Sequence, residues 1–483
     1  MTRDFEKVLV SPDTTLREVL EVVDRSGLGV ALVVNQQRQL LGLATDGDLR
    51  RAILNSNGLE TPVSQIMNVE PLTAPAGTST EAVFEMMDYV IRHVPVVDST
   101  KKVCDLVCYA ELSKKIPFAV PHIGEQEENE VAETVRSTWL TMGPRVKAFE
   151  EQVASYVGAK HAIAVSSGTA ALDVALKVLG ISPGEEIIVP AFTYIATANA
   201  VLYQHAVPVF AEIDPRTFNI DPDDVARKIT AKTRCIVSID YGGQSADYDA
   251  LRNIADEHGI YLVQDGAHSI GAEYKGRRLC NFGAINTISF HAAKVVTSVE
   301  GGMVITDDDN FARLARIIRN QGEDPVQKYY HVLLGHNYRM TDLHAAVGLK
   351  QFARLPNLLQ KRKEIAASYT EQLKQLEGDV TVPYVEPWNK HAWFFYGILI
   401  ENRDEVVRYL KSKGIDTRIA WPLPVNKQPL YMATHGNMRY PAAEEVSRRI
   451  LNLPLYPEMK EEERAYVLIH LKDAIAKTAS VKA

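Results

Sequence analysis

The stretch NTISFHAAKVVTSVEGGMVITDD, residues 286–308, places one lysine, Lys294, between a strand-like apolar run and the glycine pair Gly301–Gly302. An α/β protein usually keeps small or apolar residues at such a junction, because burying a charged amine costs free energy unless the amine is paired or neutral. The position of Lys294 therefore predicts a chemical role for its amine.

Further apolar runs precede Lys294 and alternate with helical stretches such as TAALDVALKVLG (169–180) and YDALRNIADEHG (248–259). The runs are AIAVS (162–166), EIIVP (186–190), PVFAEI (208–213), CIVSID (235–240), YLVQD (261–265) and TISFH (287–291). This alternation predicts a mainly parallel sheet covered by helices on both faces. In such sheets ligands bind beyond the carboxyl ends of the strands.

Polar and aromatic side chains follow several of these runs. SSGTAAL places Gly168 and Thr169 at the start of a helix, where free N–H groups favour a phosphate, although SGTA also serves as an ordinary helix cap. Tyr194 follows another run, where core packing is the alternative interpretation. The remaining candidates are Asp265, His268, Ser289 and Lys294.

Pyridoxal phosphate requires this combination of groups. Its aldehyde bonds covalently to a lysine amine, its phosphate needs N–H and hydroxyl donors, and its ring stacks on an aromatic side chain. Its pyridine nitrogen must stay protonated beside a carboxylate. We therefore interpret Lys294 as the covalent anchor and the proton carrier of a pyridoxal-phosphate enzyme.

Residues from about 118 to the C-terminus resemble the DegT/DnrJ/EryC1/StrS family of sugar aminotransferases, which have the type I fold of pyridoxal-phosphate enzymes. The resemblance is carried by STWLTMGPRVKAFEEQVASYVGAKHAIAVSSGTAAL (137–172), DEHGIYLVQDGAHSIGAEYKG (256–276), SFHAAKVVTSVEGGMVITDD (289–308), GHNYRMTDLHAAVGLKQ (335–351) and LNLPLYPEM (451–459). Most relatives read EDAAH or EDAAQ where this chain has QDGAH, so Gln264 and Gly266 are departures that leave the acid Asp265 in place.

The resemblance implies a role for each candidate. Lys294 resembles the Schiff-base lysine and Asp265 the partner of the pyridine nitrogen, while Tyr194 takes the ring-stacking position. His268 lies where the family contacts the cofactor's ring oxygen. Gly168, Thr169 and Ser289 match the phosphate cup, and Asn337 matches an asparagine that reaches the phosphate from the neighbouring subunit. The resemblance thus implies a homodimer or higher homo-oligomer.

The same resemblance implies a substrate class and a reaction. The amino group would pass from L-glutamate to a nucleotide-linked keto sugar, most simply a 4-keto-6-deoxyhexose as in perosamine synthases, for lipopolysaccharide or another surface polysaccharide. The alternatives are a 3-aminotransferase, an aminotransferase for a non-nucleotide keto sugar acid, and a ligand sensor that has lost turnover. The residues do not decide which nucleotide or sugar is used.

The first 115 residues contain an internal repeat with a period near 63 residues. TTLREVLEVVDRSGLGVALVVNQQRQLLGLATDGDL (14–49) aligns with STEAVFEMMDYVIRHVPVVDSTKKVCDLVCYAEL (79–112). Each copy predicts a helix, two apolar strands and the start of another helix. The pair resembles tandem CBS domains, through GLATDGDLRR (42–51) and HVPVVD (93–98).

In that family a hydroxyl residue and an acid three positions later bind a ribose, which Thr45 and Asp48 match. A helix cap is the alternative interpretation of these two residues. The second copy has Cys108 and Glu111 at the corresponding positions, so we expect one site only, for an adenine nucleotide that regulates the enzyme.

Three domains are expected: a CBS pair over 1–115, a pyridoxal-phosphate-binding domain over 116–360 and a smaller α+β domain over 361–483. The net charge of −8 and the pI near 6.0 argue against nucleic-acid binding. No apolar run reaches membrane-spanning length and MTRDFEKVLV lacks a signal-peptide core, so a cytoplasmic enzyme is expected. The four scattered cysteines suggest neither a disulfide framework nor a metal site.

Overall fold

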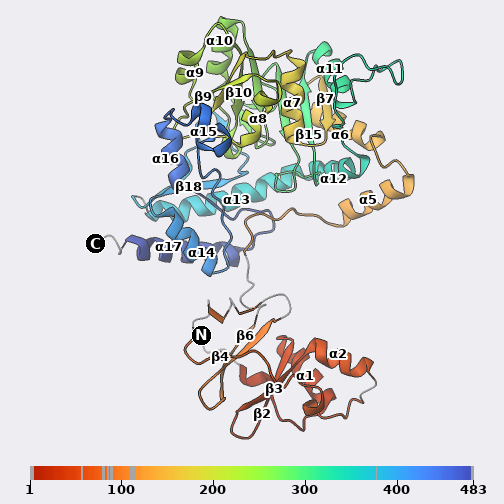
Figure 1. Cartoon of the computed structure of the whole chain (residues 1–483), viewed down its shortest axis with the longest axis vertical. Coiled ribbons are helices and arrows are strands. Elements are labelled where there is room, and N and C mark those ends of the chain that lie inside the picture. The colour runs from red at the N-terminus through yellow and green to blue at the C-terminus, as the bar shows by residue number, and fades with distance from the viewer. Residues whose placement is uncertain are drawn as a thin grey trace. The chain divides into compact units, whose positions relative to one another are not determined.

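The computed structural model describes residues 5–55, 58–78, 82–83, 86–87, 91–108, 116–376 and 378–479. The chain forms two compact units, Met1–Ile116 and Pro117–Ala483 (Figure 1). The predicted boundary between 360 and 361 falls within the helix α13 (Leu355–Leu373), so a further division of the second unit stays a prediction.

The first unit contains two three-stranded sheets, ordered β1-β2-β3 and β4-β5-β6. Its elements are η1 (Phe5–Val8), β1 (Leu9–Val10), α1 (Leu16–Ser26), β2 (Val30–Val34), β3 (Leu40–Thr45), α2 (Asp46–Leu54), η2 (Val63–Gln65), β4 (Ala74–Pro75), β5 (His93–Val97) and β6 (Val103–Cys108). In each sheet the first pair of strands is parallel and the second antiparallel.

The two sheets repeat the same local geometry. Strands β5 and β6 begin 63 residues after β2 and β3, respectively. The register also shifts at equivalent places, between Val33 and Val34 in one sheet and between Val96 and Val97 in the other. The repeat seen in the sequence is therefore a repeat of strand pairing as well.

The second unit is built on a seven-stranded sheet of order β7-β15-β14-β11-β10-β8-β9. The strands are β7 (His161–Val165), β8 (Glu186–Pro190), β9 (Val207–Ala211), β10 (Thr233–Ile239), β11 (Tyr261–Asp265), β14 (Ile285–Ser289) and β15 (Gly302–Thr306). Strand β15 runs antiparallel to both of its neighbours, and the pairs from β14 to β9 are parallel. The sheet is thus mainly parallel, as the sequence predicts.

Helices cover both faces of this sheet (Figure 1). They are α6 (Pro144–Val157), α7 (Gly168–Val178), α8 (Ile195–Tyr203), α9 (Pro222–Lys228), α10 (Tyr248–His258), α11 (Asp309–Arg319) and α12 (Asp342–Ala353), and α5 (Glu125–Ser137) packs against α12. Along β7, Ile163 and Val165 belong to the apolar core shared with α7, α8 and α11, whereas Ala162 and Ala164 belong to the core shared with α6, α10 and α12. Alternate side chains of one strand therefore serve opposite cores.

The C-terminal part of this unit adds the antiparallel sheet β16-β18-β19 and its helices. Its elements after α13 are η4 (Lys374–Leu376), β16 (Val380–Thr381), β17 (Asn389–Lys390), β18 (Tyr396–Ile400), α14 (Arg403–Ser412), η5 (Val425–Lys427), α15 (Pro429–His435), α16 (Pro441–Arg449), β19 (Ile450–Leu453) and α17 (Glu461–Ala479). Short strands β12 (Glu273–Tyr274) and β13 (Arg277–Arg278) pair with each other, and β12 also pairs with β17.

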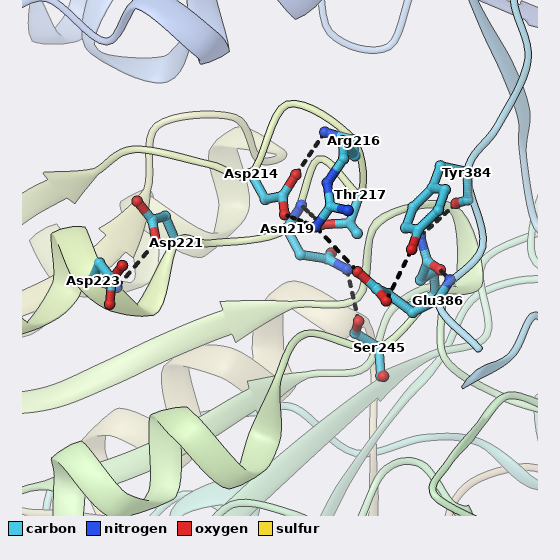
Figure 2. A network of polar contacts seen from close by, with 10 residues as sticks. Asp214, Arg216, Thr217, Asn219, Asp221, Asp223, Ser245, Tyr384 and Glu386 are labelled. Carbon is cyan, nitrogen blue, oxygen red and sulfur yellow. Dashed lines mark hydrogen bonds and ion pairs between the residues drawn. The ribbon is translucent and has the colours of Figure 1, made fainter. Parts of the chain in front are cut away.

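A polar network ties this C-terminal part to the carboxyl edge of the large sheet (Figure 2). The Arg216 guanidinium, on the loop after β9, lies 3.2 Å from Asp214 Oδ2 and 3.4 Å from Glu386 Oε1. Asn219 Nδ2 donates to the Ser245 carbonyl at 2.9 Å, which joins the loops that follow β9 and β10. These contacts hold the loops that follow β9 and β10 together and join them to the C-terminal part.

Candidate active site

The carboxyl ends of β7, β8, β11 and β14 lie along one edge of the seven-stranded sheet. Strands β8, β11 and β14 belong to its parallel part, and β7 shares their direction because β7 and β14 are both antiparallel to β15. Each of these strands is followed by at least one of the residues that the sequence nominates. The fold therefore gathers those residues at one edge.

An anion cradle lies at the start of α7. Ser167 Oγ accepts from Ala170 N at 3.1 Å and begins the helix. A Cβ on Gly168 would lie 2.8 Å from Ser289 Cβ, and a side chain on Gly302 would collide with the Ser167 carbonyl. Only glycine permits this close approach, so the first N–H groups of the helix and the Ser289 hydroxyl lie together, with Thr169 in the same turn.

Asp265 ends β11 and is 3% exposed. Its Oδ2 accepts from Thr197 Oγ1 at 2.8 Å, and its Oδ1 accepts from Ala267 N at 3.1 Å. Burial raises the pKa of Asp265, while these two hydrogen bonds and the positive charge of Lys294 oppose the increase. The carboxylate is therefore held in place by two neutral donors.

Lys294 lies in the turn between β14 and β15, where its backbone N–H bonds to the His291 carbonyl at 2.9 Å. Its Nζ lies 4.6 Å from the centroid of the Phe394 ring. Burial lowers the pKa of Lys294 to about 8, and the charge of Asp265 opposes that decrease. Near neutral pH a useful fraction of this amine is consequently neutral and nucleophilic.

His268 follows β11 in the same loop as Asp265 and is 5% exposed. Its ring stacks on Phe394 with centroids 4.3 Å apart, and Gly242 N donates to its Nδ1 at 3.4 Å. Burial, followed by the charge of Lys294, lowers the pKa of His268 well below its usual value. The imidazole is therefore neutral.

Tyr194 immediately precedes α8 and is 56% exposed. Thr197, which donates to Asp265, lies three residues later on the same helix. The start of α8 therefore carries both an accessible aromatic ring and the hydrogen-bond donor of the buried acid.

Asn337 is exposed and lies on a segment that pairs with the end of β7. Ser166 N donates to the Tyr338 carbonyl at 2.7 Å, and Val165 forms a β-bridge with Arg339. The structure contains a single chain, so the approach of Asn337 to a neighbouring subunit stays a prediction.

Two contributors were not nominated from the sequence. Thr197 could have been found as a hydroxyl one helical turn after Tyr194 in FTYIATANA. Phe394 lies in the apolar run HAWFFYGILI (391–400) and is 7% exposed, which is typical of a core residue, but its ring also contacts Lys294 and His268. No local sequence signal distinguishes these two roles of an aromatic residue.

The residues at this edge fit pyridoxal phosphate. The glycine-lined cradle suits a phosphate, the buried acid suits a protonated ring nitrogen, and the lysine amine with its lowered pKa suits an aldehyde. Within the described residues, no group of three or more His, Cys, Asp or Glu side chains could hold a metal ion. Across the same part of the chain, no helix is long and apolar enough to cross a membrane.

In the first unit, Thr45 and Asp48 form a capping box at the start of α2. Thr45 Oγ1 donates to Asp48 Oδ2 at 2.7 Å, and Arg51 Nη2 donates to Asp48 Oδ1 at 2.6 Å. Burial raises the pKa of Asp48, but the hydrogen bonds from Thr45 and Arg51 outweigh it and lower the pKa overall. In the second copy, Cys108 ends β6 and is buried, and Glu111 lies outside the described residues.

Comparison with known families agrees with both parts of this picture. Residues 121–472 match the DegT/DnrJ/EryC1/StrS aminotransferase family, and residues 1–55 and 63–117 each match the CBS domain. The chain belongs to the DegT/DnrJ/EryC1/StrS aminotransferase family, with a pair of CBS domains at its N-terminus.

Several known proteins are similar to this chain. The spore coat polysaccharide biosynthesis protein SpsC of Bacillus subtilis is 37% identical over 379 residues, which cover 74% of this chain and 97% of that protein. GDP-perosamine synthase of Caulobacter vibrioides is 36% identical over 368 residues, which cover 75% of this chain and 98% of that protein. The crystal structure of DesV from S. venezuelae superposes with a TM-score of 0.70 at 35% identity, covering 72% of this chain and 94% of DesV.

Family and fold together define the class. The protein is a pyridoxal-phosphate-dependent sugar aminotransferase with the type I fold. The predictions of the family, the fold class, the enzyme class and the cofactor are confirmed.

Proposed function

We propose that this enzyme transfers the amino group of L-glutamate to a nucleotide-linked keto sugar, most simply a 4-keto-6-deoxyhexose, for a surface polysaccharide such as lipopolysaccharide. The similarity to GDP-perosamine synthase and to a spore coat polysaccharide protein supports this substrate class. The observation that carries the proposal is the arrangement of Lys294, Asp265 and His268 beside the anion cradle at one sheet edge.

Each residue at the edge has one task in this proposal. Lys294 Nζ anchors the cofactor and moves the proton in both half-reactions. Asp265 would keep the proton on the pyridine nitrogen, and His268, as a neutral imidazole, would contact the ring oxygen. Gly168, Thr169 and Ser289 would hold the phosphate, together with Asn337 of the partner subunit of a homodimer, and Tyr194 would stack on the ring. When bound, pyridoxal phosphate supplies the electron sink and carries the amino group between the two substrates.

The CBS pair regulates the transferase in this proposal. An adenine nucleotide binds at Thr45 and Asp48 of the first copy, where the carboxylate can accept hydrogen bonds from a ribose diol. The support is the CBS match together with a partly buried hydroxyl–carboxylate pair at a helix start.

The visible absorption spectrum of the full-length protein with pyridoxal phosphate, before and after L-glutamate, tests the first half-reaction. We expect a yellow protein that loses its colour with glutamate, followed by amine formation when GDP- and UDP-linked 4-keto sugars, 3-keto sugars and free keto sugar acids are supplied in parallel. Lys294→Ala is the matched control, and it should show neither the colour change nor turnover.

The outcomes separate the candidates. Turnover of 4-keto sugars supports the proposal, whereas selective turnover of 3-keto sugars or free acids replaces its substrate. A yellow protein that ignores glutamate and every keto sugar points to a ligand sensor. Undiminished turnover by Lys294→Ala would refute the assignment of the anchor.

A further inference from the structure

Asp240 is a buried carboxylate next to the segment that carries Asp265 and His268. Asp240 follows the last residue of β10, Ile239, which is paired with Asp265, and it is fully buried. Its Oδ1 accepts from Tyr248 OH at 2.7 Å and from Ala246 N at 3.0 Å. A buried acid without a cation is expensive unless hydrogen bonds replace its hydration, and these bonds serve that purpose in part.

The other oxygen of Asp240, Oδ2, accepts hydrogen bonds from the two residues that flank the segment Asp265–His268. Gln264 Nε2 donates to Asp240 Oδ2 at 2.7 Å, and Ser269 Oγ donates to the same oxygen. Gln264 directly precedes Asp265, and Ser269 directly follows His268. One carboxylate oxygen thus brackets the four residues that begin with the candidate acid and end with the imidazole.

Gly242 and Gly243, which follow Asp240 in the chain, also contact the segment 265–268. Gly242 N donates to His268 Nδ1, and the Gly242 carbonyl accepts from Phe394 N at 2.8 Å. Gly243 has a φ of 102°, and a Cβ there would lie 3.2 Å from the His268 carbonyl. A shift of Asp240 would therefore reach the imidazole through Ser269 and through this glycine turn.

The orientation of the Gln264 amide depends on the charge of Asp240. Gln264 is fully buried, its Nε2 faces the carboxylate, and its Oε1 has no hydrogen-bond partner among the residues the structure describes. Turning the amide over would place Oε1 against a carboxylate oxygen, so the orphaned oxygen is the consequence of satisfying Asp240. Asp240 and Gln264 are therefore complementary, because the carboxylate accepts the hydrogen bond that the amide donates.

We propose that Asp240 is a positioning residue for transamination, which acts through Gln264 and Ser269 to hold Asp265 and His268 against the cofactor. This inference rests on the proposed function for its turnover readout. The catalytic groups remain Lys294, Asp265 and His268, and Asp240 touches none of the reacting atoms. The complementarity of Asp240 and Gln264 makes the proposal testable by exchanging which partner carries the amide.

The test compares Gln264→Glu, Asp240→Asn and the double variant in the full-length protein with pyridoxal phosphate. Gln264→Glu brings two carboxylates together in a buried place, so one must bind a proton or move away. We expect kcat to fall between about tenfold and a hundredfold with a smaller change in the KM for L-glutamate, because misplacement affects the reacting geometry. The visible band of the bound cofactor should shift as well.

The double variant restores the match with the roles exchanged. Position 240 then carries the amide and donates to the carboxylate at position 264, so kcat and the visible band should return to within about threefold of the wild type, as expected for coupled partners. Asp240→Asn alone should be mild, because the Gln264 amide can turn over and give its orphaned oxygen a donor. Failure of the double variant to recover would overturn the proposal.

Gln351→Glu is the matched control for stability. Gln351 is also buried, and its Nε2 donates to the carboxylate of Glu127 at 3.0 Å between α12 and α5. This change should lower Tm and leave kcat and the visible band unaltered. If it lowers kcat as much as Gln264→Glu does, or if Gln264→Glu lowers Tm alone, Asp240 is merely structural and the inference is wrong.

The readouts also distinguish this inference from the proposed function. If the wild type binds pyridoxal phosphate without turning over any keto sugar, the proposed substrate fails. The visible band and the dissociation constant of the cofactor then still report whether Gln264→Glu displaces Asp265 and whether the double variant restores it.

Discussion

The Nζ of Lys294 lies 4.6 Å from the centroid of the Phe394 ring, in contact with its face. The ring face attracts the ammonium form, whereas burial favours the neutral amine. Burial lowers the pKa of Lys294 to about 8, and the charge of Asp265 opposes that decrease. The reactivity of the amine is therefore set by opposing influences from its surroundings.

The uptake of pyridoxal phosphate by cofactor-free protein should follow this pKa. The neutral amine is the reactive form, so the uptake rate should rise with pH and level off above about 8. Phe394→Leu keeps the site apolar but removes the ring face, and it should move the midpoint down by roughly half a pH unit. Stopped-flow absorbance measures the rate. Phe395→Leu is the control, and an equal shift in both variants would contradict the role of Phe394.

Thr197→Val should weaken the enzyme without removing a charged group. The substitution keeps the shape but deletes the hydrogen bond to Asp265 Oδ2, and such bonds to charged groups contribute about 1.5–3 kcal/mol. We expect kcat to fall roughly tenfold or more, because about 1.4 kcal/mol corresponds to tenfold. Thr193→Val removes only the neighbour of Thr197 and should cost less. Steady-state kinetics of both variants test this expectation. Equal activity of the wild type, Thr197→Val and Thr193→Val would exclude a contribution of the Thr197 hydrogen bond to catalysis.

The buried Asp240 should make the stability of the protein fall as pH rises through the weakly acidic range. Burial raises the pKa of Asp240 to about 6, against the opposing effect of its hydrogen bonds. The folded state therefore binds this proton more tightly than the unfolded chain does. The contribution of Asp240 to the free energy of unfolding is thus fully present below about pH 4 and is lost as pH rises through about 6. The difference is on the order of 3 kcal/mol.

Asp240→Asn should remove this dependence. In a series of Tm measurements across the range, the Tm of the wild type should therefore fall relative to that of the variant as pH rises. Burial raises the pKa of the adjacent Tyr248 and Cys280 well above their usual values, so both stay neutral throughout this range and add no slope. Parallel Tm curves for wild type and variant would contradict the assignment.

The two capping boxes of the first unit allow a controlled test of nucleotide binding. Thr45 Oγ1 bonds to Asp48, and Thr15 Oγ1 bonds to Glu18 Oε2 at 2.9 Å at the start of α1. Asp48→Ala and Glu18→Ala should each weaken a helix start. Only Asp48→Ala should abolish the increase in Tm that ATP or AMP produces in the full-length protein. An unchanged nucleotide response in Asp48→Ala would remove Asp48 from the binding site.

The sheet and its catalytic edge were predictable because they depend on local patterns. Apolar runs separated by amphipathic stretches predict β/α alternation, and parallel strands must share one carboxyl edge, so Asp265, Ser289 and Lys294 follow from their positions after strands. The repeat of 63 residues is likewise a pattern within the chain, and it reappears as equivalent register shifts in two sheets.

Contacts between distant segments were not predictable in the same way. Phe394 reaches Lys294 across 100 residues of sequence, and Asp240 meets Gln264 and Ser269 only because neighbouring strands end together. An aromatic residue in an apolar run and an acid at a strand end look ordinary in sequence. Their functions depend on which other side chains the fold brings to them.

The shared site proposed for a homodimer can be tested by mixing two inactive chains, Lys294→Ala and Asn337→Ala. If Asn337 serves the partner's cofactor, a mixed dimer contains one site with both defects and one site with neither. Activity should then reappear on mixing and approach about half of the wild-type value per mixed dimer, since each dimer has two sites. Size-exclusion chromatography with light scattering establishes the oligomer.

If Asn337 instead serves the cofactor of its own chain, every site of the mixed dimer carries one defect and mixing restores nothing. That alternative has a structural basis, because the Tyr338 carbonyl accepts from Ser166 N immediately before the anion cradle of the same chain. Asn310→Ala, on the solvent-facing first turn of α11, is the control partner for Lys294→Ala: its chain has an intact Asn337, so mixing should leave its activity unchanged whether or not the subunits exchange. Subunit exchange demonstrated by co-purification of differently tagged chains, with no activity in the Asn337→Ala mixture, would place Asn337 in its own subunit's site.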